Sequence, residues 1–395
     1  MTDAILVINA GSSSLKFAIY PDAVGPPVAI LRGKIAGIGS APVFTVKNGA
    51  GRALPQDDFP QLEKSIGLND LVPILLDWIK AHSEGITITA AGHRVVHGGP
   101  HRDGPARVTQ ALLADLEALV PLAPMHQPHN LAAIRCVAAT APDLAQVACF
   151  DTSFHRTQNR LGQIFALPRK LTDEGILRYG FHGLSYEYIA SILPQYLGHM
   201  ATGRVIVAHL GNGASMCAMK NLRSVATSMG FTALDGLMMG RRCGTLDPGV
   251  VLFLMQHKGL TAQEIETLLY EQSGLFGVSG VSNDMVVLEA SDDACAKEAI
   301  ELFCYRAARE LAALATDMGG VDAIVFTAGI GENSARVRRM ICERLEWLGV
   351  DLDLAANELG ASRIASEASS VDILVIATNE EAVIASATRS LTQKL

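Results

Sequence analysis

One short pattern occurs twice in this chain of 395 residues: a buried strand, a turn of small residues and a second strand. The first copy covers residues 5–20 and places its turn at residues 9–14. The second copy covers residues 204–219, with its turn at residues 211–215, half the chain later. The copies share few letters, so the repeat is inferred from the pattern alone. Two related halves predict a duplicated fold with a cleft between them.

Strands and helices alternate in both halves. Apolar residues at helical spacing predict helices over residues 68–80, 110–119, 128–139 and 300–314, with another that begins at Asn379. Short apolar runs predict further strands over residues 90–97, 147–150, 323–327 and 371–377. Alternation of this kind is typical of the α/β class.

The composition excludes several classes of protein. Hydrophobic residues make up 49% of the chain and charged residues 18%, which excludes a disordered protein. The formal net charge is −8 and Lys and Arg form no cluster, which excludes a nucleic-acid binder. Seven Cys without a CxxC pair indicate reduced thiols. Because the chain shows neither a signal peptide nor a bilayer-length apolar stretch, we expect a cytoplasmic protein without a membrane partner.

The two turns are candidate phosphate-binding loops. The first leads from Asn9 to Lys16, and its small residues let backbone N–H groups approach an anion while Lys16 adds a charge. It is not a Walker loop, and an ordinary Ser-rich turn is the alternative. The second contains Asn212 and Gly213, which also form a common hairpin turn. Two such loops, one in each half, predict that a polyphosphate is held from two sides.

A third loop, AGIGEN at residues 328–333, follows a predicted strand. A strand that leads into a helix N-terminus suits a nucleotide. The dinucleotide fingerprint GxGxxG lacks its third Gly here and does not occur near the N-terminus. A nicotinamide-dependent dehydrogenase is therefore disfavoured.

Five titratable residues lie where they could do chemistry: Arg94, Asp151, His182, Arg242 and Glu380. Each also has an ordinary structural explanation, since the acids could cap helices, the arginines could form surface ion pairs and the imidazole could lie in the core. A zinc site is disfavoured because no acidic or Cys residue at familiar spacing completes the set His93, His97, His101, His126 and His129.

Taken together, these residues resemble the acetate kinase family, the short-chain carboxylate kinases in the superfamily of sugar kinases, actin and heat-shock chaperone ATPases. Each matching stretch is weak alone, and jointly they are specific. They follow the family's order: NAGSSSLKF (9–17), HRVVHGG (93–99), PLAPMHQPHN (121–130), FDTSFH (150–155), YGFHG (179–183), HLGNGAS (209–215), DPG (247–249), AGIGEN (328–333) and TNEE (378–381).

The resemblance implies a duplicated two-domain α/β fold of the ribonuclease H-like or actin-like ATPase type, with the active site in the interdomain cleft. The N-terminal domain would comprise residues 1–152 plus 383–395, and the C-terminal nucleotide-binding domain residues 153–382. The implied reaction is the reversible, direct in-line transfer of the ATP γ-phosphoryl group to acetate, which yields acetyl phosphate and ADP. Mg²⁺ would be the cofactor, with Mn²⁺ as an alternative ion. A carboxylate is already a nucleophile at neutral pH, so positioning and charge neutralisation provide most of the catalysis.

The family's functional positions carry over residue by residue. Catalysis falls to Asp151, which orients the site, and to His182 and Arg242, which stabilise the transferring group. The carboxylate substrate would be bound by Arg94, Val96, Met125 and Phe181. Magnesium would be bound by Asn9 and Glu380. The nucleotide would be bound by Ser14, Lys16, His209, Leu210, Gly211, Asn212, Gly213, Asp284, Met285, Val286, Gly329, Ile330, Gly331, Glu332 and Asn333.

Three positions depart from the family pattern. Ala233 replaces a Pro that usually lines the acyl pocket, Arg241 replaces a Thr, and Val286 replaces an Arg of the adenosine segment. The last change removes a cation near the expected nucleotide and bears on nucleotide specificity. None of the three removes a residue that is expected to do chemistry.

Two other functions remain open. A propionate-preferring kinase of the same family would differ only in pocket volume, and one methylene is worth about 1–3 kcal/mol. An actin-like or chaperone-like ATPase would share the phosphate loops but would not need Arg94 and Val96 around a small carboxylate. The family precedent also predicts a homodimer.

Overall fold

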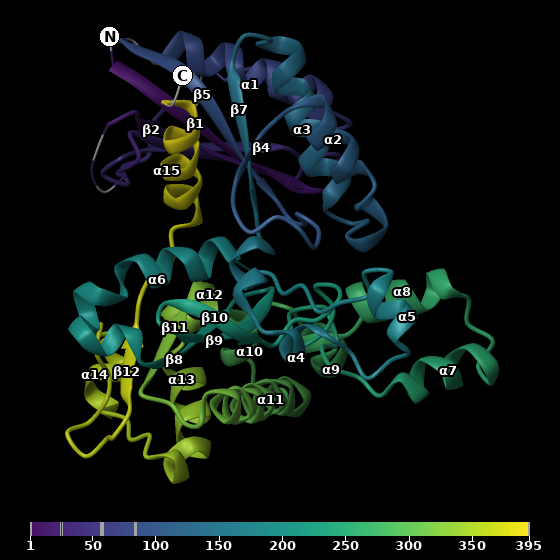
Figure 1. Cartoon of the computed structure of the whole chain (residues 1–395), viewed down its shortest axis with the longest axis vertical. Coiled ribbons are helices and arrows are strands. Elements are labelled where there is room, and N and C mark those ends of the chain that lie inside the picture. Colours follow the sequence, from purple (N-terminus) through teal and green to yellow (C-terminus); the bar gives the residue numbers. More distant parts are fainter. Residues whose placement is uncertain (1, 24, 26, 56–58, 83–84, 394–395) are drawn as a thin grey trace. The chain divides into compact units, whose positions relative to one another are not determined.

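The structure is a computed structural model that describes residues 2–23, 25, 27–55, 59–82 and 85–393. The chain forms two compact units (Figure 1). The first unit comprises Met1–Phe154 and Asn379–Leu395, and the second comprises His155–Thr378. The domain limits expected from the family resemblance, 1–152 with 383–395 and 153–382, stay a prediction.

The first unit contains a seven-stranded sheet in the order β4-β3-β2-β1-β5-β7-β6. Its strands are β1 (Thr2–Ala10), β2 (Ser14–Pro21), β3 (Leu31–Ala36), β4 (Val43–Asn48), β5 (Ile86–Val95), β6 (Ala106–Arg107) and β7 (Ala145–Phe150). β1 lies between antiparallel β2 and parallel β5 and is buried over residues 4–8. A central strand that is covered on both faces needs a continuous apolar run, which explains the sequence AILVI.

Helices cover this sheet: α1 (Leu68–His82), α2 (Gln110–Glu117), α3 (Gln127–Thr140) and α15 (Glu380–Thr392). Apolar side chains of α1 and α3 pack with those of β1 and β2 in one core cluster. α15 packs against β1, β5 and β7, on the other side of the strands from α1 and α3 (Figure 1). A Cβ at Gly92 would collide with Thr388 and Ile384. The glycine therefore lets α15 lie close to β5.

The second unit contains a five-stranded sheet in the order β10-β9-β8-β11-β12. Its strands are β8 (Arg204–Leu210), β9 (Ala214–Lys220), β10 (Arg223–Thr227), β11 (Ala323–Thr327) and β12 (Asp372–Val375). β8 pairs antiparallel with β9 and parallel with β11, as β1 does with β2 and β5. The order and directions of β3-β2-β1-β5-β7 are thus repeated in β10-β9-β8-β11-β12. The predicted duplication and the α/β class are confirmed.

The helices of the second unit are α4 (Arg160–Gln163), α5 (Arg169–Asp173), α6 (Gly183–Leu197), α7 (Pro248–Gln256), α8 (Ala262–Glu271), α9 (Gly274–Ser279), α10 (Met285–Glu289), α11 (Ala294–Met318), α12 (Ala328–Asn333), α13 (Ala335–Cys342) and α14 (Leu354–Glu358). α11 packs against β8, β9 and β10, and Figure 1 shows α6 above and α11 below that sheet. The predicted loop at 328–333 is itself a short helix, which starts from Ala328 in the left-handed region at φ 66°.

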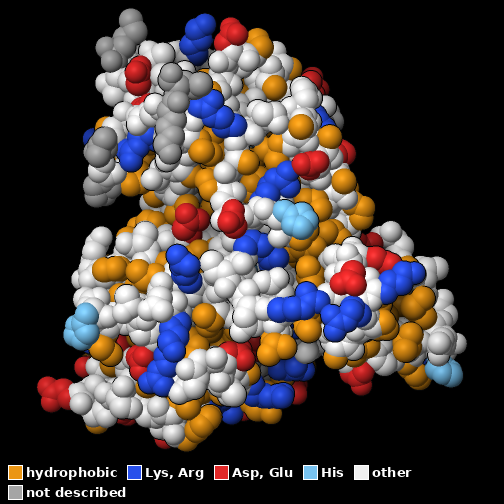
Figure 2. All heavy atoms as spheres, in the orientation of Figure 1, with side chains coloured by type: hydrophobic (Ala, Val, Ile, Leu, Met, Phe, Trp, Pro, Cys, Tyr) orange, Lys and Arg blue, Asp and Glu red, His pale blue; other side chains and the backbone are white. Residues whose placement is uncertain are grey.

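The visible surface carries charged side chains of both signs (Figure 2). Figure 2 shows Lys and Arg side chains interspersed with Asp and Glu over the visible faces of both units. Over the described part of the chain, every helix is too short or too polar to traverse a bilayer. Among the described residues, the Cys side chains form no disulfide.

Candidate active site

Three neighbouring strands of the first unit carry polar side chains where they end. Asn9 lies at the end of β1, Arg94 at the end of β5, and Asp151 directly follows β7. β5 runs parallel to both β1 and β7. Because the carboxyl ends of parallel strands meet at one edge of a sheet, the fold gathers these three side chains in one place.

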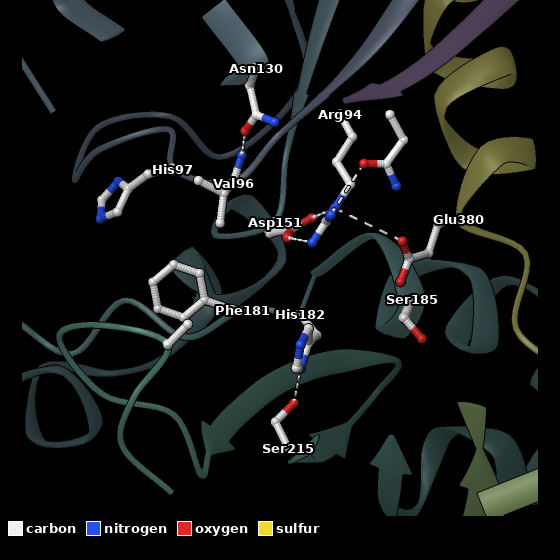
Figure 3. Close-up of polar contacts among 12 residues, drawn as sticks. Arg94, Val96, His97, Asn130, Asp151, Phe181, His182, Ser185, Ser215 and Glu380 are labelled. Carbon is white, nitrogen blue, oxygen red and sulfur yellow. Dashed lines mark hydrogen bonds and ion pairs between the residues drawn. The ribbon is translucent and has the colours of Figure 1, made fainter. Parts of the chain in front are cut away.

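Arg94 is the centre of this group (Figure 3). Its Nε donates to Oδ1 of Asp151 at 3.1 Å, and its Nη2 donates to Oδ2 at 2.6 Å. Its Nη1 donates to Oδ1 of Asn9 at 3.3 Å, and its Nε lies 4.0 Å from Oε2 of Glu380. Burial by itself lowers the pKa of Arg94, but attraction to Asp151 and Glu380 outweighs burial and raises the pKa. Arg94 is therefore a fixed cation whose Nε and Nη2 donors are both engaged by the carboxylate of Asp151.

The start of α15 fixes the backbone that carries Glu380. The side chain of Asn379 caps the first turn of the helix and accepts a hydrogen bond from the Tyr20 hydroxyl at 3.2 Å. Nε of Arg32 donates to Oε2 of Glu381 at 3.2 Å. The residues on both sides of Glu380 are thus tied to β2 and β3, which directs the Glu380 carboxylate toward Arg94.

Asn130 connects the backbone after β5 with the end of β1. Its Oδ1 accepts from the N–H of Val96 at 3.0 Å (Figure 3). Its Nδ2 donates to the carbonyl of Ala10 at 2.6 Å. Val96 and Asn130 are buried, whereas Met125 is 40% exposed. The side chain of Asn130 therefore holds both Val96, the predicted wall of the acyl pocket, and the turn that follows β1.

The first turn leaves a lysine exposed beside Asn9. The N–H of Gly11 donates to the carbonyl of Ser14 at 2.8 Å and closes the turn. Lys16 lies opposite Asn9 in the β1–β2 register, and its side chain is exposed. An exposed ammonium next to a turn of small residues is suited to an anion.

Two stacked imidazoles lie in the second unit. The rings of His182, at the start of α6, and His209, on β8, are 4.6 Å apart and inclined by 21°. Nδ1 of His182 is 2.6 Å from Oγ of Ser215 (Figure 3). Nδ1 of His209 is 2.8 Å from Oγ of Ser185. Each ring is thus held at Nδ1 by a buried serine hydroxyl.

Two side-chain nitrogens converge over Gly213. A Cβ at this position would lie 3.3 Å from Nη2 of Arg242 and 3.3 Å from Nε2 of His182. Nη1 of Arg242 donates to the carbonyl of Ala233 at 2.6 Å, which fixes the guanidinium. Phe181, which directly precedes His182 in the chain, is buried. Because only glycine leaves this space open, the loop can admit an anion between its backbone and the two nitrogens.

A pocket of about 360 Å³ lies in the second unit, within the usual size range of small-molecule sites. Nδ2 of Asn283 donates to Oδ1 of Asn212 at 3.0 Å, and Asp284 caps α10. Val286 is 70% exposed, and Leu210 is buried in β8. The lining residues are Gly211, Asn212, Asn283, Asp284, Met285, Val286, Glu289, Gly329, Ile330, Asn333 and Ser334.

Gly331 and Glu332 make the contacts that hold α12 in place. Oε1 of Glu332 accepts from the N–H of Ala328 at 2.8 Å and from the N–H of Thr378 at 3.3 Å. The buried Arg338 donates from Nη1 to the carbonyls of Gly331 at 2.9 Å and Glu332 at 3.0 Å. These contacts hold the short helix, of which Gly329, Ile330 and Asn333 line the pocket.

Sequence reasoning missed the residues behind the site. Asn130 and Ser215 each end a stretch that matches the family, so their place in a motif was the available signal. Tyr186 lies four residues after His182, which is one helical turn, but no motif marks it. Arg338 gave no signal, because a buried arginine that bonds to backbone carbonyls resembles any surface arginine in sequence.

Comparison with known proteins identifies the family. The sequence model described as the acetokinase family matches residues 4–386. The acetate kinase of Rhodopseudomonas palustris (strain TIE-1) is 54% identical over 391 residues, which cover 98% of this chain and 97% of that protein. The structure of a propionate kinase from Francisella tularensis subsp. tularensis SCHU S4 has a TM-score of 0.90 at 36% identity, and coverage is 98% of this chain and 99% of that one. For the Porphyromonas gingivalis acetate kinase the TM-score is 0.87 at 34% identity, with the same coverage of 98% and 99%. The predicted resemblance is confirmed, and this chain belongs to the acetokinase family.

Proposed function

We propose that this protein is an acetate kinase, which reversibly transfers the γ-phosphoryl group of ATP to acetate and yields acetyl phosphate and ADP. The observation that carries the proposal is the Arg94 guanidinium, held by Asp151 at the ends of three strands in a member of the acetokinase family. A guanidinium is the side chain best matched to a small carboxylate.

The acceptor side of the reaction falls to the first unit. Since Asp151 engages Nε and Nη2 of Arg94, acetate would bind at Nη1, whose bond to Asn9 is the longest of the group at 3.3 Å. Asp151 orients the guanidinium and neither forms a phosphoryl intermediate nor takes a proton. Acetate needs no general base, because a carboxylate is ionised at neutral pH.

The donor side falls to the second unit. Arg242 and His182, which converge over Gly213, would bind the equatorial oxygens of the transferring phosphoryl group, where charge develops. His209, Gly211, Asn212 and the backbone of their loop would hold the phosphates, joined by Ser14 and Lys16 of the first unit. Direct in-line transfer requires that both sets of groups act on one ATP molecule.

The nucleoside would occupy the pocket beside α10 and α12. Asp284, Met285 and Val286 would bind it on one side, and Gly329, Ile330 and Asn333 on the other. Gly331 and Glu332 would contribute by holding α12 rather than by touching the nucleoside. Leu210 would likewise support the loop from the core.

The residues of the first unit fit magnesium bound together with a nucleotide. Within the described residues, no group of three or more His, Cys, Asp or Glu side chains could hold a metal by itself. Asn9 and Glu380 offer an amide oxygen and a carboxylate, and Mg²⁺ commonly binds to one or two such ligands plus substrate phosphates. Asn9 and Glu380 would therefore hold Mg²⁺ or Mn²⁺. The bound ion would neutralise charge on the phosphate oxygens.

The substrate's methyl group would lie against Val96, Met125 and Phe181. Val96 in the first unit and Phe181 in the second are both apolar and buried. A propionate-preferring enzyme is the alternative, because the Francisella tularensis neighbour is named a propionate kinase. We propose that acetate is preferred about tenfold, which corresponds to about 1.4 kcal/mol.

Hydroxylamine trapping tests the proposed reaction. With ATP, Mg²⁺ and acetate, the protein should yield acetyl hydroxamate, whereas an actin-like or chaperone-like ATPase would release phosphate and give none. Arg94→Leu should raise the acetate concentration needed for half-maximal hydroxamate formation about 10- to 100-fold. Arg135→Leu, which removes an exposed arginine paired with Glu117 in the same unit, is the matched control and should behave as the parent. ATP hydrolysis without hydroxamate would contradict the proposal.

We further propose a cytoplasmic homodimer. The support for assembly is the family resemblance and the exposed apolar side chains of α7, which are Val250, Leu252, Phe253 and Met255. Light scattering should give twice the chain mass for the parent and the chain mass for Phe253→Asp. A parent that is monomeric would contradict the homodimer.

A further inference from the structure

A chain of hydrogen bonds lies behind His182 in the second unit. Nδ1 of His182 is 2.6 Å from Oγ of Ser215, and Oγ of Ser215 is 2.5 Å from the hydroxyl of Tyr186. Ser215 lies on β9 and Tyr186 one turn after His182 on α6. Both supporting side chains are fully buried. The chain of bonds therefore joins the start of the helix to the sheet, away from solvent.

The hydrogens in this chain can be assigned from acidity. A phenol ionises near pH 10 and is a much stronger acid than an aliphatic hydroxyl, so Tyr186 donates to Ser215. Ser215 has a single hydrogen, and its oxygen already accepts from Tyr186. The other partner of that oxygen is Nδ1 of His182, so in this arrangement the hydrogen of Ser215 has Nδ1 as its acceptor. A neutral imidazole that accepts at Nδ1 carries its hydrogen on Nε2.

We propose that Tyr186 and Ser215 are positioning residues that fix His182 as the Nε2–H tautomer and direct that N–H over Gly213. Nε2 is the atom that lies 3.3 Å from a Cβ built on Gly213, together with Nη2 of Arg242. Both atoms that converge there are then donors. In the other tautomer, a lone pair on Nε2 would face the anion and oppose it.

The consequence for catalysis rests on the proposed function, whereas the tautomer does not. An anion over Gly213 would receive a hydrogen bond from a ring that cannot rotate, because Ser215 holds its opposite nitrogen. Preorganised donors of this kind act mainly on charge that develops in the transition state. Loss of the support should therefore lower kcat and leave the binding of ATP and acetate almost unchanged.

Kinetics of three single variants test the positioning role. Tyr186→Phe should lower kcat about tenfold and Ser215→Ala about 100-fold. Loss of a complete donor lowers kcat by about 10²–10³, so neither variant should exceed that range. The Michaelis constants for ATP and acetate should stay within about twofold of the parent. Tyr179→Phe is the control: it removes another buried tyrosine hydroxyl, which donates to the carbonyl of Gly175 at 2.8 Å and not to a histidine chain. It should keep the parent kcat, and an unchanged kcat in Tyr186→Phe would overturn the proposal.

Nitrogen NMR of the histidine-labelled full chain tests the tautomer without any substrate. The signals of His182, assigned by their loss in His182→Ala, should show a protonated Nε2 and an unprotonated Nδ1 in the parent. Tyr186→Phe and Ser215→Ala should shift both signals toward a mixture of tautomers. A parent with the hydrogen on Nδ1, or the same tautomer in all variants, would overturn the proposal. If the parent made no acyl phosphate, the proposed function would fail while this measurement still decided the tautomer.

Discussion

The two units differ in what holds their main candidate functional side chain: a charged partner in the first and a neutral partner in the second. Arg94 in the first unit is a cation fixed by a carboxylate, through two bonds to Asp151 at 3.1 Å and 2.6 Å. His182 in the second unit is held at Nδ1 by the hydroxyl of Ser215. Removal of Asp151 leaves the Arg94 cation with only the more distant carboxylate of Glu380, at 4.0 Å, whereas removal of the Ser215 hydroxyl leaves a ring free to turn. Changes behind Arg94 should therefore affect stability, and changes behind His182 should affect turnover.

The largest effect is expected on the turnover side of this comparison. Arg242→Ala should lower kcat by about 10²–10³, because one donor to the transferring group is lost. ATP affinity, measured by calorimetry, should change little. The adjacent Arg241→Ala, which removes a guanidinium stacked 4.8 Å over the ring of Phe276, is the control and should keep most of the activity. Near-normal turnover of Arg242→Ala would contradict the claim that the second unit's side chains determine turnover.

The stability side is tested by Asp151→Ala. Its side chain is almost fully buried and Arg94 is 23% exposed, so loss of the carboxylate should cost about 2–4 kcal/mol in the free energy of unfolding. Urea denaturation measures this change. The double variant Asp151→Ala with Arg94→Leu should recover part of the loss, since the cation that lost its main partner is removed as well. A double variant that is less stable than Asp151→Ala would show that the charge is not the cause.

The binding of acetate and ATP gives a further test of the difference between the two units. Arg94→Leu should raise the acetate Michaelis constant about 10- to 100-fold, as expected for loss of a charge-assisted hydrogen bond. ATP affinity should stay close to that of the parent, because the nucleoside pocket lies in the second unit. If ATP binding failed while acetate saturation was unaltered, Arg94 would belong to the nucleotide side.

Each unit also contains a buried imidazole, and here the two should behave alike. Burial lowers the pKa of His93 to about 4, against an opposing side-chain bond from Gln146, and lowers the pKa of His155 to about 3. The unfolded chain binds these protons near pH 6.5, so stability falls as the pH decreases below 6.5. At pH 5 each imidazole should account for about 2 kcal/mol of the loss. Urea midpoints at pH 7 and pH 5 should differ less in His93→Gln than in the parent, and an equal difference would contradict the assignment.

The smallest effect concerns the choice between acetate and propionate. Val96 is buried, with its N–H bonded to Asn130 at 3.0 Å, so its side chain is a fixed wall. Val96→Ala should reduce the acetate preference by about threefold to tenfold, because the added methylene gains about 0.8 kcal/mol where it fits. Ala233→Pro should increase the preference. The measurement is the ratio of kcat/KM for the two acids, and a ratio that neither change moves would place the wall elsewhere.

Much of the fold follows from local pattern in the sequence. The strands expected over 204–210 and 323–327 have the same limits in β8 and β11, because continuous apolar runs bounded by Gly or polar residues leave little choice. The helix at 328–333 was harder to predict, since two glycines in six residues favour a loop. Tertiary contacts override that tendency: Arg338 holds the carbonyls of Gly331 and Glu332.

The candidate site was predicted as residue types and not as contacts. Motifs pointed to Arg94 and Asp151, but their pairing depends on β5 and β7 being neighbours in the sheet. Local spacing carries no information on that order. The same holds for Asn130, whose two bonds reach residues far away in the chain. The roles proposed for these residues stay predictions until the variants are measured.

The path of the chain has a consequence for its synthesis. The first unit is left at Phe154 and re-entered at Asn379, and α15 then covers β1, β5 and β7. Nε of Arg107 donates to the carbonyl of Leu391 at 2.9 Å, so even the last turn of α15 is tied to this sheet. A ribosome releases residues in order, so residues 155–378 emerge while one face of the first sheet is still bare. The middle of the polypeptide can finish folding before its beginning, and a nascent chain stalled ahead of Glu380 should expose β5 to proteases and chaperones.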